Sequence, residues 1–239
     1  MSLCASPCAR CKMGIETHLR VHAIEAGVYT QFTVPDTAGN EFHGFDGHSI
    51  LQMSGAGGLR IGRVSALGSF RFCAATSIFE KDLSTESASE LEKGALLVTM
   101  RSGVGYSVPR KRRTELEPSL SYCWAWQRAR LELQDRDTQQ ILRPVYCKHS
   151  DRGISLGLAV RIWDLNIDDD RSGTYPRFRL EYSFADVLGG MHILGVEYKF
   201  LEHGYSPLHE GTQSFLLVGE LALSPPAKYV TVGIGVNIS

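Results

Sequence analysis

The sequence predicts an all-β fold, a single antiparallel β-barrel of about 10–12 strands. Three observations support this prediction. Many stretches alternate apolar and polar side chains, which is the pattern of strands with one buried face. Turn signals separate these stretches, with no repeat, low-complexity tract or linker between them. No window approaches the roughly 18 apolar residues of a transmembrane helix. A soluble β-barrel or β-sandwich built from the same strands is the alternative.

The N-terminal 14 residues do not alternate, and they contain Cys4, Cys8 and Cys11. Residues 1–14 are therefore expected to be a cysteine-bearing tail, and residues 15–239 to form the barrel as one domain. Cys8-x-x-Cys11 followed by two histidines has features of a zinc site, but the gap between the two pairs is too short for a zinc finger. The preferred interpretation is a tail that is mobile or is held by a protein partner.

Four strands are expected in the first third of the chain. The first two would be joined around Glu25-Ala26-Gly27, and the next two around Leu67-Gly68. Glycine-rich stretches at 42–48 and 54–58 are expected to be loops. The four strands are predicted within 15–24, 28–34, 59–66 and 69–79.

One short helix is expected near 85–93. Ser87-x-x-Glu90 resembles a capping box, and Gly94 follows it as a helix-ending glycine. The segment has little apolar surface, so the helix is expected to lie on a loop.

Eight further strands are expected from residue 95 onward. The apolar positions change parity after Trp126, which indicates either a bulge or the start of a helix. A four-residue loop at 225–228 would join the last two strands and pair Leu223 with Val230. The eight strands are predicted at 95–108, 118–132, 139–148, 154–165, 177–187, 191–201, 213–224 and 229–238.

Residues 178–200 form the clearest predicted hairpin. Because side chains on a strand have a period of two, the loop must pair even positions with even positions, and a two-residue Gly-Gly turn does not do this. A three-residue loop at 188–190 does, and it places Gly190 where a left-handed conformation is needed. This loop pairs Phe178 with Phe200. A slip by two residues remains open, because it would replace a pairing of two glutamates with a glutamate–lysine pair.

The faces opposite the aliphatic ones mix very small residues with charged ones. A water-facing sheet normally carries Thr, Lys, Glu and Gln and avoids glycine. Glycine alternating with Arg and Glu instead suits a narrow polar interior, with the aliphatic faces toward lipid and an aromatic girdle at one strand end. Six cysteines, a C-terminal Asn-Ile-Ser and the lack of an apolar N-terminal segment favour the soluble alternative. The predicted inner face includes Thr99, Arg101, Gly103, Ser155, Gly157, Arg161, Arg179, Glu181, Glu197, Lys199, Thr231 and Gly233; the predicted girdle includes Phe178, Tyr198 and Phe200.

Composition limits the partners. A formal net charge of −1 argues against nucleic acid. Membrane lipid is the expected partner, and an outer membrane, bacterial or organellar, is the expected location. A reducing compartment is the location expected for the soluble alternative, because six cysteines favour unpaired thiols.

A histidine and a serine lie on one polar segment after the 191–201 strand. Gly195-x-x-Tyr198-x-Phe200 followed by His203 and Ser206 resembles outer-membrane lipid A deacylase barrels. The resemblance covers about 25 residues, the His–Ser spacing is longer by one, and proline replaces the family's asparagine. It implies a Ser/His acyl hydrolase. From the residue types, His203 is expected as base and Ser206 as nucleophile, with Glu210 or Glu202 orienting the imidazole, and a polar connecting loop is the alternative.

An acidic segment offers a candidate calcium site. Asp164, Asn166, Asp168 and Asp170 place oxygen ligands at alternate positions, although the glycine and glutamate of an EF-hand loop are absent. A solvated acidic loop is the alternative. No other cofactor is predicted.

Three functions follow from these patterns. The first is a transmembrane barrel with a narrow polar interior that acts as a pore, an anchor or an assembly component. The second is a soluble barrel or sandwich that binds an apolar small molecule or a protein. The third is the barrel hydrolase.

Overall fold

The computed structural model describes most of the chain after residue 14. The described residues are 15–35, 41–43, 48–77, 81–82, 88–111, 113–135, 141–165, 171–172, 176–204, 212–223 and 227–238. No helix occurs in them. None of their segments is a helix long and apolar enough to cross a membrane.

All regular structure in the described residues is strand. The strands are β1 Ile15–Pro35, β2 Glu41–His43, β3 His48–Ile61, β4 Val64–Ser77, β5 Lys81–Asp82, β6 Ala88–Tyr106, β7 Val108–Lys111, β8 Thr114–Asp135, β9 Ile141–Ile162, β10 Asp164–Leu165, β11 Arg171–Ser172, β12 Phe178–Ala185, β13 Met191–Gly204, β14 Thr212–Leu223 and β15 Ala227–Ile238.

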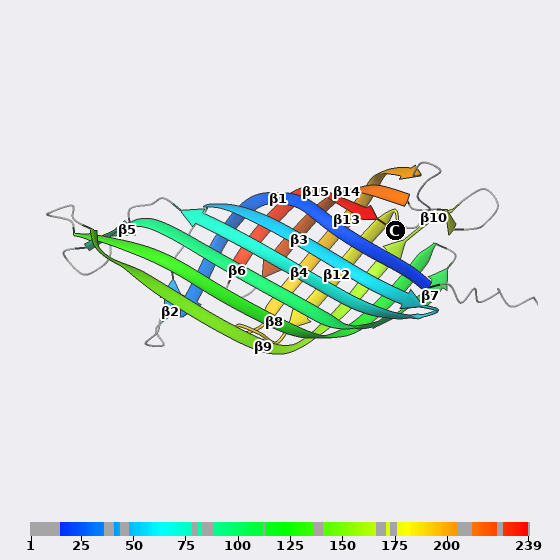
Figure 1. The fold of residues 1–239 in the computed structure, drawn as a ribbon, viewed down its shortest axis with the longest axis horizontal. Coiled ribbons are helices and arrows are strands. Elements are labelled where there is room, and N and C mark those ends of the chain that lie inside the picture. The colour runs from blue at the N-terminus through cyan, green and yellow to red at the C-terminus, as the bar shows by residue number, and fades with distance from the viewer. Residues whose placement is uncertain are drawn as a thin grey trace, which may run out of the picture.

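Ten of these strands close into an antiparallel barrel, which confirms the predicted fold class (Figure 1). Their order is β6-β4-β3-β1-β15-β14-β13-β12-β9-β8, and β8 pairs again with β6. The short strands β2, β5 and β7 extend the ends of β1, β6 and β8, and β10 pairs with β11 in a separate ribbon.

The strands are staggered as they pass round the barrel. The stagger is found by moving from each residue to its partner on the next strand until the path returns to the first strand. A path that starts at Gln127 of β8 passes through Glu25 of β1 and comes back to β8 at Glu115, 12 residues earlier. With ten strands, this stagger gives a strand tilt of about 40° and a backbone radius of about 10 Å. Long side chains from opposite walls can therefore meet at the axis.

The predicted opening hairpin is wrong. β1 continues through Glu25 and Gly27, with a register shift between His22 and Ile24. Gly27 is required by close packing of two strands, not by a turn, because a Cβ atom there would lie 1.8 Å from the carbonyl oxygen of Val230. Alternation alone did not separate these two uses of glycine.

The next turn also lies elsewhere. Residues 54–58, expected to be a loop, are part of β3, and Leu67-Gly68 lies inside β4. The turn is at Gly62, which has φ of 62°. Gly68 pairs with Gly57 in the middle of the wall, so these glycines thin the sheet without ending a strand.

The predicted helix near 85–93 is wrong over 88–93, and 85–87 lie outside the described residues. Ala88 begins β6, and Glu90 pairs with Leu133 of β8. A nine-residue helix without an apolar face is marginal in water, whereas a strand here extends an existing ladder. The segment after Trp126 is also strand, and β9 joins the two strands expected at 139–148 and 154–165.

The two C-terminal hairpins form with the predicted faces but are shifted by two residues. Phe178 pairs with Tyr198, and Leu223 pairs with Lys228. The first loop has five residues, 186–190, and Gly190 has φ of 97°, as its predicted left-handed role requires. Because both shifts equal the side-chain period, every side chain stays on its predicted face.

The outer face is apolar, and the inner face is polar except near the 186–190 loop. Many of the large hydrophobic side chains that point outward are exposed, with exposed fractions between 37% and 59%, and the others are half-buried. On β9 and β15 the aliphatic runs cover 154–162 and 230–238, close to the roughly 9–11 residues with which a tilted strand crosses a bilayer. The predicted girdle residues Phe178, Tyr198 and Phe200 lie near one barrel end, and the rings of Phe200 and Phe215 are 6.4 Å apart. This is the arrangement of transmembrane β-barrels.

Candidate functional site in the barrel interior

Ion pairs cross the interior between strands that are not neighbours. Each links an arginine on the β3–β4–β6 side to a glutamate on another part of the ring. The pairs are Arg60 Nη1 to Glu115 Oε1 at 3.1 Å, Arg101 Nη1 to Glu181 Oε1 at 3.8 Å, and Arg71 to Glu220.

One end of the barrel, which we call the Gly62 end after its turn, holds two buried carboxylates. Glu115 and Glu117 are 0% and 2% exposed. Arg161 donates to Glu117 Oε1 at 2.6 Å and to Glu115 Oε1 at 3.3 Å, and Ser107 Oγ donates to Glu115 Oε1 at 2.6 Å. Arg60 supplies the second positive charge, so the cluster is balanced. Balance is necessary, because an uncompensated buried charge is strongly destabilising.

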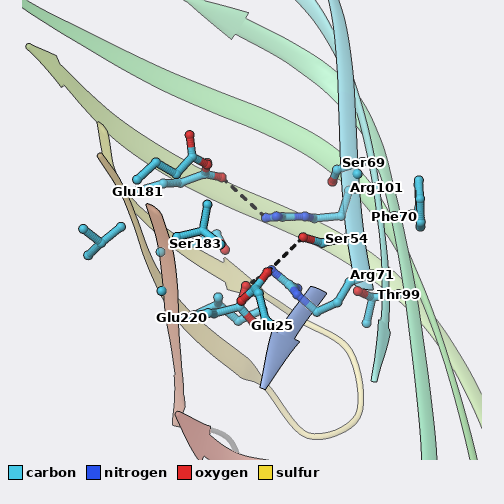
Figure 2. A pocket seen from close by; sticks show the side chains of 17 residues that line it. Glu25, Ser54, Ser69, Phe70, Arg71, Thr99, Arg101, Glu181, Ser183 and Glu220 are labelled. Carbon is cyan, nitrogen blue, oxygen red and sulfur yellow. Dashed lines mark hydrogen bonds and ion pairs between the residues drawn. The ribbon is translucent and has the colours of Figure 1, made fainter. Parts of the chain in front are cut away.

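The centre of the barrel holds a second network, and Figure 2 shows four of its members, Arg71, Glu220, Glu25 and Ser54. Arg71 donates to Glu220, which also accepts a hydrogen bond of 2.6 Å from the hydroxyl of Tyr229. Glu25 points into the same space. Its carboxylate accepts hydrogen bonds from Gln52 Nε2 at 3.2 Å, Ser54 Oγ at 3.1 Å and Thr231 Oγ1 at 2.7 Å.

The cavities beside this network are small. Arg71 and Arg101 border one of about 50 Å³, and Arg101 and Arg179 border another of about 60 Å³. Such volumes hold a few water molecules and exclude larger ligands. Arg179 narrows the second cavity by pairing with Glu181 and with Glu197, the latter at 3.2 Å.

The opposite end, which we call the Val187 end, is filled by apolar side chains. The 186–190 loop folds back over the barrel opening, and the Leu188 N–H donates to Asp151 Oδ2 at 2.8 Å. Cys73 lies at the boundary with the polar centre, where its Sγ donates to Gln52 Oε1 at 3.0 Å. The cluster comprises Ile50, Cys73, Ala95, Leu97, Cys123, Ala125, Ala185, Val187, Leu188, Met191, Ile193, Ala222 and Tyr229.

The interior that the structure describes therefore has two parts, a charged one and an apolar one. Among the described residues, its charged groups are engaged with each other or with hydroxyl and amide groups rather than presented to a ligand-sized space. This arrangement supports a rigid, filled barrel.

The candidate calcium site is described only at Asp164. Its Oδ2 atom lies 3.1 Å from Lys199 Nζ, and Lys199 also donates to Glu202 at 2.6 Å. Asn166, Asp168 and Asp170 lie outside the described residues. Within the described part of the chain no group of three or more His, Cys, Asp or Glu side chains could hold a metal. Calcium binding stays a prediction.

The candidate hydrolase residues also stay a prediction. His203 belongs to β13, where it pairs with Gln213 of β14. Ser206 and Glu210 lie outside the described residues, as do Cys4, Cys8 and Cys11 of the tail. Two cysteines that the structure does describe, Cys73 and Cys123, are buried free thiols.

Sequence reasoning found part of the interior and missed another part. Arg101, Arg161 and Arg179 face inward as predicted. Glu25 was assigned to a turn, and Glu117 lay before the strand predicted from 118. Every second residue from 115 to 123 faces inward and is polar or small: Glu115, Glu117, Ser119, Ser121 and Cys123. This alternation could have extended the predicted strand back to residue 114, because Pro118 lies on the outward face.

Comparisons with known proteins give matches among solved structures only. No family model matches the chain, and no curated protein sequence matches it. Among solved structures, Ail, the attachment invasion locus protein of Yersinia pestis, is similar at 10% identity and a TM-score of 0.34, over 92% of this chain and 97% of that chain. Ail in complex with the heparin analogue sucrose octasulfate gives 10% identity and a TM-score of 0.36, over 95% and 99%. Neisserial surface protein A gives 10% identity and a TM-score of 0.29, over 94% and 98%.

Proposed function

We propose that the chain is a transmembrane β-barrel of an outer membrane, bacterial or organellar, and that it acts as a closed anchor in the lipid. The observation that carries the proposal is the outward direction of the large apolar side chains on nine of the ten barrel strands, namely β3, β4, β6, β8, β9 and β12–β15. In water this face would be a continuous apolar surface far larger than monomeric soluble proteins expose. In a bilayer it meets acyl chains, and the closed ring leaves no strand edge to the lipid.

The filled interior supports an anchor in preference to a pore. Cross-barrel ion pairs occupy the centre, and the apolar cluster occupies the Val187 end. The two cavities described beside the central network, of about 50 and about 60 Å³, have room for only a few water molecules. β8 and β9 continue beyond the aliphatic band at the Val187 end and extend past β12–β15 (Figure 1). The anchor would hold this extension outside the lipid.

Two measurements test the proposal. The full chain should fold into phosphatidylcholine vesicles and become protected from added protease over its strands. In planar bilayers the inserted protein should add no steady conductance. A variant that shortens residues of both parts of the interior, with Arg71→Ser, Glu220→Ser, Leu97→Ala and Met191→Ala, is the matched control and should conduct if it inserts. A chain that is monodisperse in buffer without detergent would refute the membrane location. A steady channel formed by the unaltered protein would refute the closed anchor.

A further inference from the structure

The outer wall is hollowed over β3, β4, β6 and β8. Gly57 of β3 pairs with Gly68 of β4, and Gly68 pairs with Ser102 of β6. Three neighbouring residues without large side chains leave a groove of about 440 Å³ on the outward face, and the larger side chains beside it form its walls. These walls are Phe70, Met100, Tyr122 and Trp124.

The groove runs along the outward face and is open on one side, so it has room for a stretch of one acyl chain. Its position in the middle of the aliphatic band makes it continuous with the surface that the proposed function assigns to lipid. The groove therefore fits one acyl chain.

The Trp124 wall of the groove leads to a basic patch, defined as Arg128, Lys148 and Arg152. Trp124 pairs with Arg152, and Arg128 pairs with Lys148. The side chains of all three cations lie on the same outward face as the aliphatic band and are exposed. They lie just beyond the aliphatic run of β9, with Trp126 beside them. None of the outward-facing side chains that the structure describes on β8 and β9 is acidic.

Position and charge together select the ligand. Tryptophans beside a membrane band lie at the headgroup level, and cations just beyond it meet the lipid phosphates. Arginine also binds phosphate oxygens in a bidentate geometry. A lipid with its phosphate on the basic patch would direct a chain past Trp124 into the groove.

We infer that this face binds one anionic lipid of the leaflet at the Val187 end, with the phosphate on Arg128, Lys148 and Arg152 and one acyl chain in the Gly57–Gly68 groove. The inference rests on the proposed membrane location and deepens it by naming the lipid class. It assigns the tryptophans at 124 and 126 as reporters, because they lie between the phosphate and the chain. The third tryptophan, Trp163, lies near the Gly62 end and is only 7% exposed.

The test uses tryptophan quenching by brominated acyl chains. The full chain is inserted into phosphatidylcholine vesicles that contain a small fraction of dibrominated phosphatidylglycerol, or the same fraction of dibrominated phosphatidylcholine. The anionic quencher should reach half of its effect at a concentration at least fivefold lower, since one cation near the surface contributes about that factor. Arg128→Gln with Lys148→Gln and Arg152→Gln should remove this preference. Arg128→Lys with Arg152→Lys should retain most of it.

Three controls separate the possible outcomes. Arg110→Gln with Arg113→Gln removes exposed cations at the Gly62 end and should leave the preference unchanged. Gly68→Leu fills the groove, because a Cβ atom there meets only the Gly57 carbonyl oxygen at 4.0 Å, and should weaken quenching by the anionic lipid several-fold. Added inorganic phosphate should not reverse the quenching.

Each contrary result overturns a defined part. Equal quenching by both lipids in protein that is protected from protease refutes the lipid site and leaves the membrane anchor intact. Failure to insert into either vesicle refutes the anchor itself. If inorganic phosphate reverses the quenching, the basic patch binds small anions and not a lipid. If the variant of Arg110 and Arg113 loses the preference for the anionic lipid equally, the preference comes from general attraction of anionic lipid to a positively charged surface.

Discussion

The two faces of a single strand show how differently the barrel uses its sequence. On β15 the outward face is a run of aliphatic side chains, and the inward face alternates hydroxyl, amide and aromatic groups with glycine. The outward residues are Val230, Val232, Ile234, Val236 and Ile238; the inward residues are Tyr229, Thr231, Gly233, Gly235 and Asn237. Members of the first set are nearly interchangeable, whereas members of the second have individual partners.

This contrast explains which errors the fold tolerates. A shift of two residues in a hairpin exchanges one outward aliphatic residue for another and changes little in lipid. The same shift on the inner face would separate Glu220 from Arg71 and Thr231 from Glu25. Register is therefore specified by the interior, where each polar group needs its own partner.

Breaking a central ion pair should have the largest effect. Glu220→Leu leaves the guanidinium of Arg71 buried without its carboxylate and removes the acceptor of the Tyr229 hydroxyl. We expect the free energy of unfolding to fall by about 3–5 kcal/mol. Urea unfolding in vesicles measures the change.

The double variant is the control for this prediction. Arg71→Met with Glu220→Leu removes both charges and should recover part of the loss. If the double variant loses the sum of the two single effects, the residues do not interact and the cross-barrel pair is wrong.

Substituting the same residue type on the two faces sharpens the comparison. Leu97 is fully buried in the apolar cluster, and Leu97→Ala should cost about 2–5 kcal/mol because a cavity remains. Leu217 points outward, where lipid chains can fill the gap. Leu217→Ala should therefore lower the free energy of unfolding by only about 1–2 kcal/mol, which is the hydrophobic contribution of the removed carbon atoms. Both are measured by urea unfolding. Equal losses would mean that the apolar cluster is not tightly packed.

The same contrast explains what the sequence could predict. Alternation identified the strands of the barrel, and the glycines mixed with Arg and Glu opposite the aliphatic residues indicated which face points outward, because most strands repeat both signals. It did not locate the turn at Gly62 or the continuous β1, because glycine serves both at turns and where strands pack closely, as Gly27 does against Val230. It also could not identify partners such as Arg71 and Glu220. Those residues lie 149 positions apart in the chain, and only the stagger of the closed ring brings them together.

A charge placed at different depths on the outer face tests where the lipid lies. Ile234 and Ile238 are both outward on β15, with exposed fractions of 59% and 49%, but Ile234 lies in the middle of the aliphatic band and Ile238 at its edge. In a bilayer Ile234→Lys should cost about 2–4 kcal/mol, and Ile238→Lys about 0–1 kcal/mol, because an ammonium near the edge reaches the headgroups. Urea unfolding in vesicles measures both, and Ile234→Leu should be near neutral. Equal costs for the two lysines would show that the aliphatic band does not follow the bilayer.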